Sequence, residues 1–263
     1  MPSPKLQRRC VLPLLASFGL CAARPSPAAD ALALFSYHLK PPFVLDERAR
    51  TGLYPELLPL LARHLGRPLT LSYLPRLRLL ELLAHQRLPG AVLGVSPLWF
   101  EPSPILRWTP PLLEDADLLV SRRTLPIAAA QRVGRRLALP RGYRVPSLQD
   151  DLRAGRIVLS EPNSEPSALA MLLHGRVDAA LLTLRTLQAL LRDRPDWRAQ
   201  LHVDAEPVGR YELGILVPPA LEGEHGAFSM AVRRLRRDPA YPALLRTHLG
   251  PEVDEARFIQ NLR

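Results

Sequence analysis

Short apolar runs alternate with amphipathic helical patterns along the chain beyond residue 30. The runs have the length of strands, and most are apolar at successive positions rather than at alternating ones. They are 31–37, 69–74, 91–95, 117–122, 136–139, 156–160, 177–183, 201–204 and 212–217. Because strands covered on both faces are apolar throughout, the pattern predicts largely parallel sheets with helices on each side.

Helical patterns fill the intervals between these runs. An apolar stripe from Leu53 to Leu65 ends at Gly66, a residue suited to a helix C-terminus, although Pro59 is unfavourable within it. Further helices are predicted at 79–87, 168–174, 184–191, 228–237 and 241–249. The alternation predicts an α/β protein, in which segment 125–135 is interpreted as a connection between two halves.

The first 29 residues have the layout of a secretory signal peptide. Basic residues precede the apolar segment 11–23, and small residues follow it. Cleavage after Ala28 fits best, with Ala23 and Ala29 as alternatives. Both cysteines of the chain lie in the segment 1–29, so the mature chain has no disulfide. We therefore expect an exported, periplasmic protein.

The basic charge carries little information about partners. Of 35 Lys and Arg residues only Lys5 and Lys40 are lysines, which indicates a coding bias towards arginine. Loss of the four basic residues of the signal peptide lowers the formal net charge from +10 to +6. The arginine clusters lack the interleaved aromatic residues of a single-strand binder, so we expect no nucleic-acid partner.

Motifs of common enzymes and metal sites are missing from the sequence. It contains no G-x-S-x-G elbow, no phosphate-binding G-x-x-x-x-G-K loop and no H-E-x-x-H pair. The seven histidines are scattered without metal-ligand spacing. We therefore expect no catalytic residue, no metal and no cofactor.

A series of short stretches carries a family resemblance through its order and spacing. The stretches are Tyr37–Phe43 with its Pro-Pro-Phe turn, Gly52–Leu57, Leu61–Gly66, Leu74–Arg78, Gly94–Pro97, Trp108–Pro111, Leu139–Tyr143, His174–Ala180 and Tyr211–Val217. Together they resemble the family 3 periplasmic solute-binding proteins, which have the type II periplasmic binding protein fold. The resemblance covers about 31–250.

This resemblance implies two α/β lobes, each with a mostly parallel sheet flanked by helices, joined by two crossover strands. Lobe one would comprise 30–119 and 213–263, the latter including the C-terminal tail, and lobe two 120–212. A hinge near 118–121 and 209–213 would close the lobes on a ligand.

The resemblance also implies candidate ligand-binding residues in the cleft. They are Tyr37 and Phe43 as apolar walls, Arg76 or Arg78 as the charge, Ser96 as a hydroxyl, Arg141, Gly142 and Tyr143 from lobe two, and Thr183. Core packing is an equal reading of Tyr37 and Phe43, whereas for Arg78 a surface position on a helix is the slightly favoured reading.

Two departures from the family pattern bear on the ligand. The stretch after Ser96 has no arginine to hold an α-carboxylate, and Thr183 stands where amino-acid binders have an acidic residue. We therefore expect a small polar or anionic solute rather than a free amino acid. The resemblance implies a monomeric binding protein for the inner-membrane permease of an ABC-type importer. A ligand sensor, an orphan binding protein and an enzyme on the same fold are the alternatives.

Overall fold

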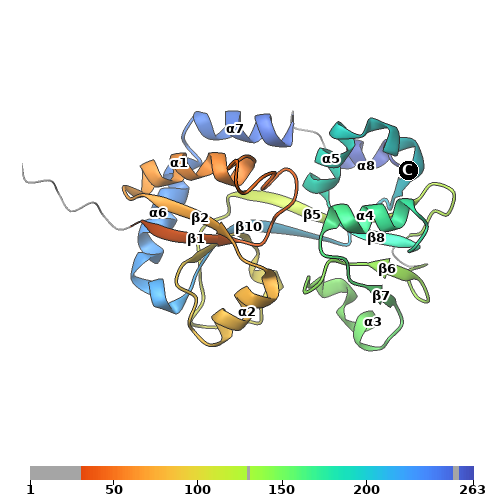
Figure 1. Cartoon of the computed structure of the whole chain (residues 1–263), viewed down its shortest axis with the longest axis horizontal. Helices are drawn as coiled ribbons and strands as arrows, with labels where there is room; N and C mark the ends of the chain where they lie inside the picture. Colours follow the sequence, from red (N-terminus) through yellow and green to blue (C-terminus); the bar gives the residue numbers. More distant parts are fainter. Residues whose placement is uncertain (1–30, 129–130, 251–254) are drawn as a thin grey trace, which may run out of the picture.

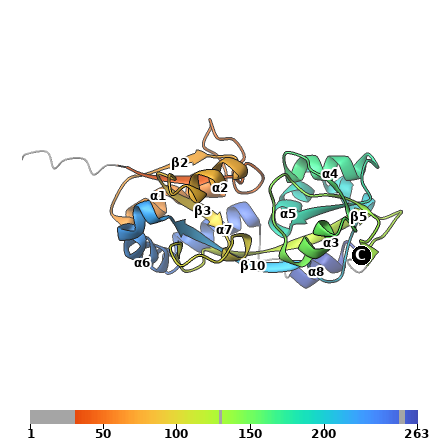
Figure 2. The same ribbon diagram turned by 90° about the horizontal axis from the view of Figure 1, so that it is seen from below.

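The computed structural model describes residues 31–128, 131–250 and 255–263, and the predicted signal peptide lies outside the described residues. These residues form two α/β lobes, lobe one at the left of Figure 1 and lobe two at the right. Two long strands, β5 (Leu113–Arg122) and β10 (Gly209–Val217), run from one lobe to the other. Figure 2 shows both along one side of the molecule. The two-lobed α/β fold predicted from the sequence is confirmed.

Lobe one has the strand order β2-β1-β3-β10, with short β4 beside β10. Its other strands are β1 (Leu32–Ser36), β2 (Leu69–Tyr73), β3 (Ala91–Val95) and β4 (Arg107–Trp108). β1 is parallel to β2 and β3, whereas β10 is antiparallel to β3 and β4. The helices are α1 (Leu53–Leu65), α2 (Arg76–Ala84), α6 (His225–Leu235) and α7 (Ala240–Leu249).

Helix α1 follows its predicted bounds. Leu53, Leu57 and Leu61 point into the lobe-one core, where α1 packs against α6. Gly66 takes a left-handed φ of 75°, a conformation that costs glycine little and ends the helix. Pro59 lies within the helix on its exposed face, so its missing N–H does not open the core side.

Lobe two has the strand order β5-β8-β6-β7, with β9 also on β5. Its strands are β6 (Arg136–Ala138), β7 (Val158–Ser160), β8 (Ala179–Thr183) and β9 (Leu201–Val203). β6 is parallel to β7 and β8, and β5 is antiparallel to β8 and β9. The helices are α3 (Gln149–Arg153), α4 (Glu165–Leu173), α5 (Leu184–Asp193) and α8 (Glu255–Gln260).

The structure corrects three expectations about the lobes. The tail assigned to lobe one instead packs Phe258, Ile259 and Leu262 into the core of lobe two, where these apolar side chains become buried. Segment 125–135 does not connect two halves, because Ile127 is buried in lobe two. The crossing residues of β5 are 113–117, paired with 209–213, whereas 118–121 pair with β8 inside lobe two.

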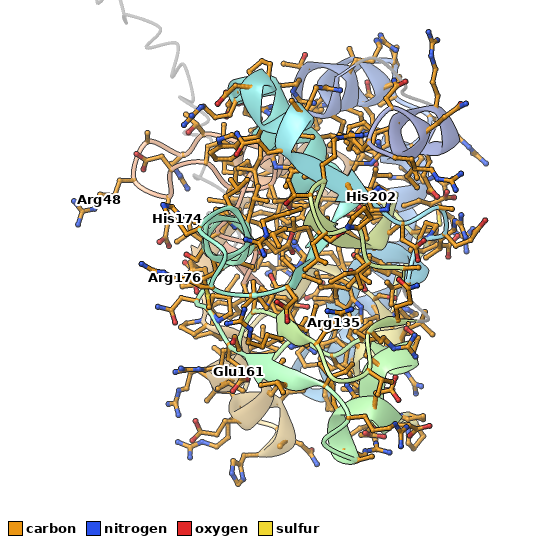
Figure 3. The ribbon with its side chains drawn as sticks, turned by 90° about the vertical axis from the view of Figure 1, so that its right-hand side faces the viewer. Arg48, Arg135, Glu161, His174, Arg176 and His202 are labelled. Carbon is orange, nitrogen blue, oxygen red and sulfur yellow. The ribbon has the colours of Figure 1, made fainter. Side chains whose placement is uncertain are left out.

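Figure 3 labels three arginines, Arg48 of lobe one and Arg135 and Arg176 of lobe two. Arg48, Arg135 and Arg176 lie well apart in Figure 3. Arg48 and Arg176 are exposed to solvent, and Arg135 is half-buried. Charges separated in this way are solvated individually.

Candidate functional site

Residues from both lobes converge on a small polar cavity between them. Its volume is about 20 Å³. It is lined by Tyr37, His38, Lys40, Arg76, Trp99, Asp117, Tyr143, Arg144, Val145, Thr183 and Tyr211. Two buried cations of lobe one, Lys40 and Arg76, contact lobe two here and define two ends of the cleft.

The Arg76 end is built where α2 begins. Arg76 is the first residue of the helix, directly after Pro75, and is only 6% exposed. Its guanidinium donates to the Tyr37 hydroxyl at 2.6 Å, to the Gly142 carbonyl at 2.6 Å and to the Trp99 carbonyl at 3.1 Å. Tyr37 follows β1, and Gly142 lies in a lobe-two turn, so this one side chain joins the two lobes.

Gly142 is required at this position by its backbone. Its φ of 76° is left-handed, which disfavours other residues. A Cβ there would also meet the Leu77 side chain at 3.0 Å. Glycine therefore permits the close approach that brings its carbonyl to Arg76.

Aromatic rings surround the Arg76 guanidinium. Its central carbon lies 4.9 Å from the centroid of Tyr37 and 5.6 Å from that of Phe100. The Tyr37 ring is 6.4 Å from Trp99 and 6.3 Å from Tyr143 of lobe two. This end of the cleft is thus a positively charged group with flat apolar walls.

The Lys40 end is closed by a buried ion pair. Lys40, in the loop after β1, pairs with Glu165, and the two side chains are 3% and 1% exposed. Lys40 Nζ also donates to Thr183 Oγ1 at 3.3 Å, and the Thr183 N–H donates to the Glu165 carboxylate at 2.9 Å. Glu165 begins α4 and Thr183 ends β8, so the helix N-terminus and a strand end of lobe two meet a lysine of lobe one.

Burial shifts the pKa values of the neighbouring titratable groups towards their neutral forms. Loss of solvent, together with the nearby Glu165 carboxylate, raises the pKa of Asp117 to about 8, and the Tyr211 hydroxyl donates to this carboxyl at 3.0 Å. Burial also raises the pKa of Asp115 to about 6. Burial lowers the pKa of His38 well below its usual value, with Lys40 and Arg76 adding to the effect. At neutral pH Asp117 and His38 are therefore mostly uncharged, whereas Asp115 is mostly ionised.

The structure brings together five of the residues expected in the cleft. Tyr37, Arg76, Gly142, Tyr143 and Thr183 all lie at the lobe interface. Of the two arginine alternatives, Arg76 is therefore the one that reaches the cleft.

Of the four other expected residues, three lie outside the cleft cavities and one lines a cavity next to the central one. Arg78 is exposed and pairs with Glu81 at 2.7 Å on its own helix. Phe43 is fully buried in the lobe-one core, and Ser96 is buried and accepts the Leu98 N–H. Arg141 is exposed and lines an adjoining cavity of about 300 Å³ between the lobes, which it shares with Lys40 and Glu165.

Sequence reasoning missed the residues that give the cleft its charge. Lys40 and Glu165 were not selected, nor were Trp99 and Asp117. Lys40 had one visible signal, since it is a rare lysine in an arginine-biased chain.

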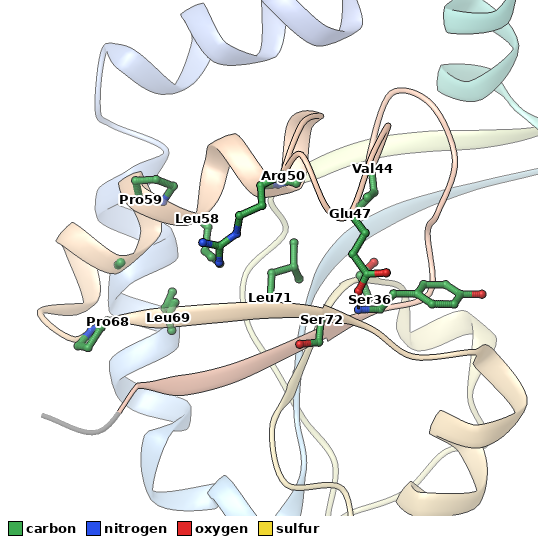
Figure 4. Close-up of a pocket in the computed structure, with 13 residues that line it drawn as sticks. Ser36, Val44, Glu47, Arg50, Leu58, Pro59, Pro68, Leu69, Leu71 and Ser72 are labelled. Atoms are coloured by element: carbon green, nitrogen blue, oxygen red, sulfur yellow. Dashed lines mark hydrogen bonds between the residues drawn. The ribbon is translucent and has the colours of Figure 1, made fainter.

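A larger cavity of about 450 Å³ lies within lobe one, between α1, β2 and the loop after β1 (Figure 4). Its walls are mostly apolar and include Leu58, Leu69 and Leu71. Arg50 and Glu47 reach it from the exposed loop. All its lining residues belong to one lobe, so hinge motion would not assemble it.

Among the described residues no helix is long and apolar enough to cross a membrane. A scan against protein-family models finds no match, and no curated protein matches the sequence.

Solved structures do match the fold. The ligand-binding core of GluR0 from Nostoc punctiforme, in complex with L-glutamate, is 15% identical, with a TM-score of 0.68 over 84% of this chain and 100% of that one. A histidine kinase sensor domain with similarity to periplasmic binding proteins is 21% identical, with a TM-score of 0.72 over 85% and 97%. The substrate-binding protein of an amino acid ABC transporter is 15% identical, with a TM-score of 0.65 over 83% and 99%. The chain therefore has the fold of the family 3 periplasmic binding proteins.

Proposed function

We propose that this protein binds a small anionic solute between its two lobes. The observation that supports this most directly is the state of Arg76. Its guanidinium is buried, and its hydrogen-bond partners within the described residues are all neutral oxygens. A buried charge without a counter-charge costs several kcal/mol, and a bound anion would offset that cost.

The surrounding groups favour an anion for the same reason. Asp117 lines the cavity, but with its pKa raised to about 8 by burial it carries little negative charge at neutral pH. It therefore does not neutralise Arg76. A guanidinium binds a carboxylate or phosphate through paired hydrogen bonds, which suits either group on the solute.

The aromatic walls favour a solute with a flat or apolar body next to its charge. Tyr37, Trp99 and Tyr143 stand around the guanidinium from both lobes. Ring faces and edges of this kind bury carbon while the charged group of a ligand meets the arginine.

Ligand entry requires the lobes to separate. The central cavity between Arg76 and Lys40 has a volume of only about 20 Å³, and side chains of both lobes meet across it. Two larger cavities, of about 530 and 300 Å³, adjoin it between the lobes but do not give a ligand room at its centre. Among the strands of the described residues, only β5 and β10 run between the lobes, so rotation about 113–117 and 209–213 would open the cleft. Binding is the whole activity in this proposal, without a catalytic step.

We infer that the protein is exported and delivers its solute to a permease of an ABC-type importer. The signal-peptide pattern of residues 1–29 supports export, and the likeness to a substrate-binding protein of an ABC transporter supports delivery. The likeness to a histidine kinase sensor domain favours a second candidate, in which the same capture is reported to a receptor. Intact-mass measurement of protein from a periplasmic fraction tests export, and an uncleaved cytosolic species would contradict it.

Thermal denaturation with a panel of anions tests the binding proposal. The panel comprises aromatic and aliphatic monocarboxylates, dicarboxylates, phosphate and sulfate. At 100 times its dissociation constant a ligand stabilises by about 2.7 kcal/mol, which corresponds to a midpoint shift of about 5–10 °C for a chain of this size. Small-angle scattering with the same ligand should show a smaller radius of gyration.

Two variants on the same helix sharpen this test. Arg76→Gln should lose the anion-dependent shift, whereas Arg78→Gln, an exposed arginine two residues away, should keep it. Failure of every anion to shift the midpoint, or an unchanged shift in Arg76→Gln, would show that the cleft does not use this guanidinium.

A further inference from the structure

Lys40 sits among groups that together have the chemistry of an ammonium-binding site. The Glu165 carboxylate pairs with its Nζ atom, and Thr183 Oγ1 accepts a second hydrogen bond at 3.3 Å. The Nζ atom also lies 5.4 Å from the ring centroid of Phe43 and 5.6 Å from that of Tyr143. We call these four residues (Glu165, Thr183, Phe43 and Tyr143) the ammonium cage.

The composition of the ammonium cage suits a cationic head group. A carboxylate supplies the counter-charge, a hydroxyl supplies a directional acceptor, and aromatic rings supply cation–π attraction. Protein sites for ligand cations use these groups because together they replace the water that the cation loses. In this chain the cation is supplied by the protein itself.

The ammonium cage borders the central cavity of the cleft, and its residues come from both lobes. Lys40 and Thr183 line the same small cavity as Arg76. Phe43 comes from lobe one, whereas Glu165, Thr183 and Tyr143 come from lobe two. A lysine used only to stabilise one lobe would not need partners from the other.

We propose that Lys40 is a built-in occupant of this ammonium site and so excludes ligands with an ammonium group from the cleft. The proposal rests on the proposed function and deepens it. The cleft would accept an anion at Arg76 but would have no vacant place for the second, positive charge of a zwitterion. Carboxylates without an amino group are the preferred ligand class.

Removal of the lysine side chain should expose the site to an external cation. Lys40→Ala lacks three carbons and the nitrogen, so n-propylammonium is the matching probe. Isothermal titration should show that this variant binds n-propylammonium with a dissociation constant of about 1 mM or tighter, a plausible value for so small a ligand. The wild-type protein should bind it at least 10-fold more weakly, and 1-propanol, which has the same size without the charge, should bind neither.

Two further variants separate the charge from the space. Lys40→Ala/Glu165→Gln keeps the space but lacks the carboxylate and should lose n-propylammonium binding. Lys40→Met fills the space without a charge and should also fail to bind it. If Lys40→Ala does not fold alone, refolding in n-propylammonium should restore soluble protein, whereas 1-propanol should not.

Equal binding of n-propylammonium by Lys40→Ala and by Lys40→Ala/Glu165→Gln would overturn the proposal, as would no binding and no rescue. This outcome is distinct from a failure of the proposed function, because the titration uses no anion. Conversely, n-propylammonium binding to Lys40→Ala/Arg76→Gln should equal that to Lys40→Ala, even if no anionic solute is ever found.

Discussion

Lys40 and Arg76 are both buried cations of lobe one that contact lobe two, yet they are compensated differently. Lys40 meets the Glu165 carboxylate inside the protein, whereas the partners of Arg76 in the described part of the chain are neutral oxygens. The charge at the Lys40 end of the cleft is thus neutralised by the protein itself, whereas the charge at the Arg76 end is not. The difference teaches that closure and ligand selection can rest on different residues of one cleft.

The ion pair should dominate the stability of the closed form. Removal of one partner leaves the other as an uncompensated buried charge, so Glu165→Gln should lower the free energy of unfolding by about 3–5 kcal/mol. Urea denaturation measures this change. Glu81→Gln, which breaks the exposed pair with Arg78, is the matched control and should change stability by less than about 0.5 kcal/mol. Equal losses of stability in the two variants would show that the buried Lys40–Glu165 pair contributes no more than an exposed ion pair.

Asp117 should make stability fall as the pH rises. Burial raises its pKa in the folded chain to about 8, above the ordinary value of an aspartate, so folding favours the protonated form. Below about pH 4 this carboxyl is protonated in both states and does not lower the free energy of unfolding. From there towards pH 8 it lowers the free energy of unfolding by about 1.4 kcal/mol per pH unit.

Denaturation at pH 5 and pH 7 tests this dependence on the wild-type protein and on Asp117→Asn. In the variant the free energy of unfolding should differ much less between pH 5 and pH 7 than in the wild-type protein. The variant should exceed the wild-type protein in stability more at pH 7 than at pH 5. A pH dependence that is the same in both proteins would mean that Asp117 is ionised in the folded state.

Arg76→Gln should affect ligand binding more than folding. The variant leaves oxygen acceptors with fewer donors, but it also removes a buried charge, so the free energy of unfolding should change by less than about 2 kcal/mol without ligand. Affinity for the anion found in the panel should fall at least 10-fold, since a charge-assisted hydrogen bond contributes about 1.5–3 kcal/mol. A stability loss as large as that of Glu165→Gln would show that both ends of the cleft serve closure alike.

The rim of the cleft should matter least. Arg144 of lobe two pairs with Glu101 of lobe one, but Glu101 is 79% exposed and water screens the pair. Glu101→Gln should therefore lower the free energy of unfolding by less than about 1 kcal/mol. A larger loss of stability in urea denaturation would show that the Arg144–Glu101 pair at the rim holds the lobes together more strongly than the Lys40–Glu165 pair does.

The regular elements of the fold could be predicted because the sequence pattern reports them locally. The stripe from Leu53 to Leu65 and its terminal Gly66 became α1 with the expected bounds. The apolar run 91–95 became β3 in the same way. The short helices α3 and α8 were missed, since five or six residues are too few to show a helical period.

The cleft was harder to predict because its residues become a site only when the lobes meet. In the sequence Glu165 looks like an ordinary acidic residue in the first turn of a helix. Its partner Lys40 belongs to lobe one, so the pair forms only when the lobes meet. Arg76 and Arg78 could not be separated by sequence, although residues two apart on a helix point to nearly opposite sides. Where sequence motifs named the correct strand ends, as at Tyr37 and Thr183, the structure placed them in the cleft.

The position of α8 also sets a limit on how far the lobes can swing apart. Helix α7 packs in lobe one and α8 in lobe two, and only residues 251–254 join them. Five Cα–Cα steps separate Gly250 from Glu255, so the two ends can be at most about 18 Å apart while both helices stay docked. The covalent chain therefore sets an upper limit on the opening, and any wider separation would first have to undock α7 or α8 from its lobe.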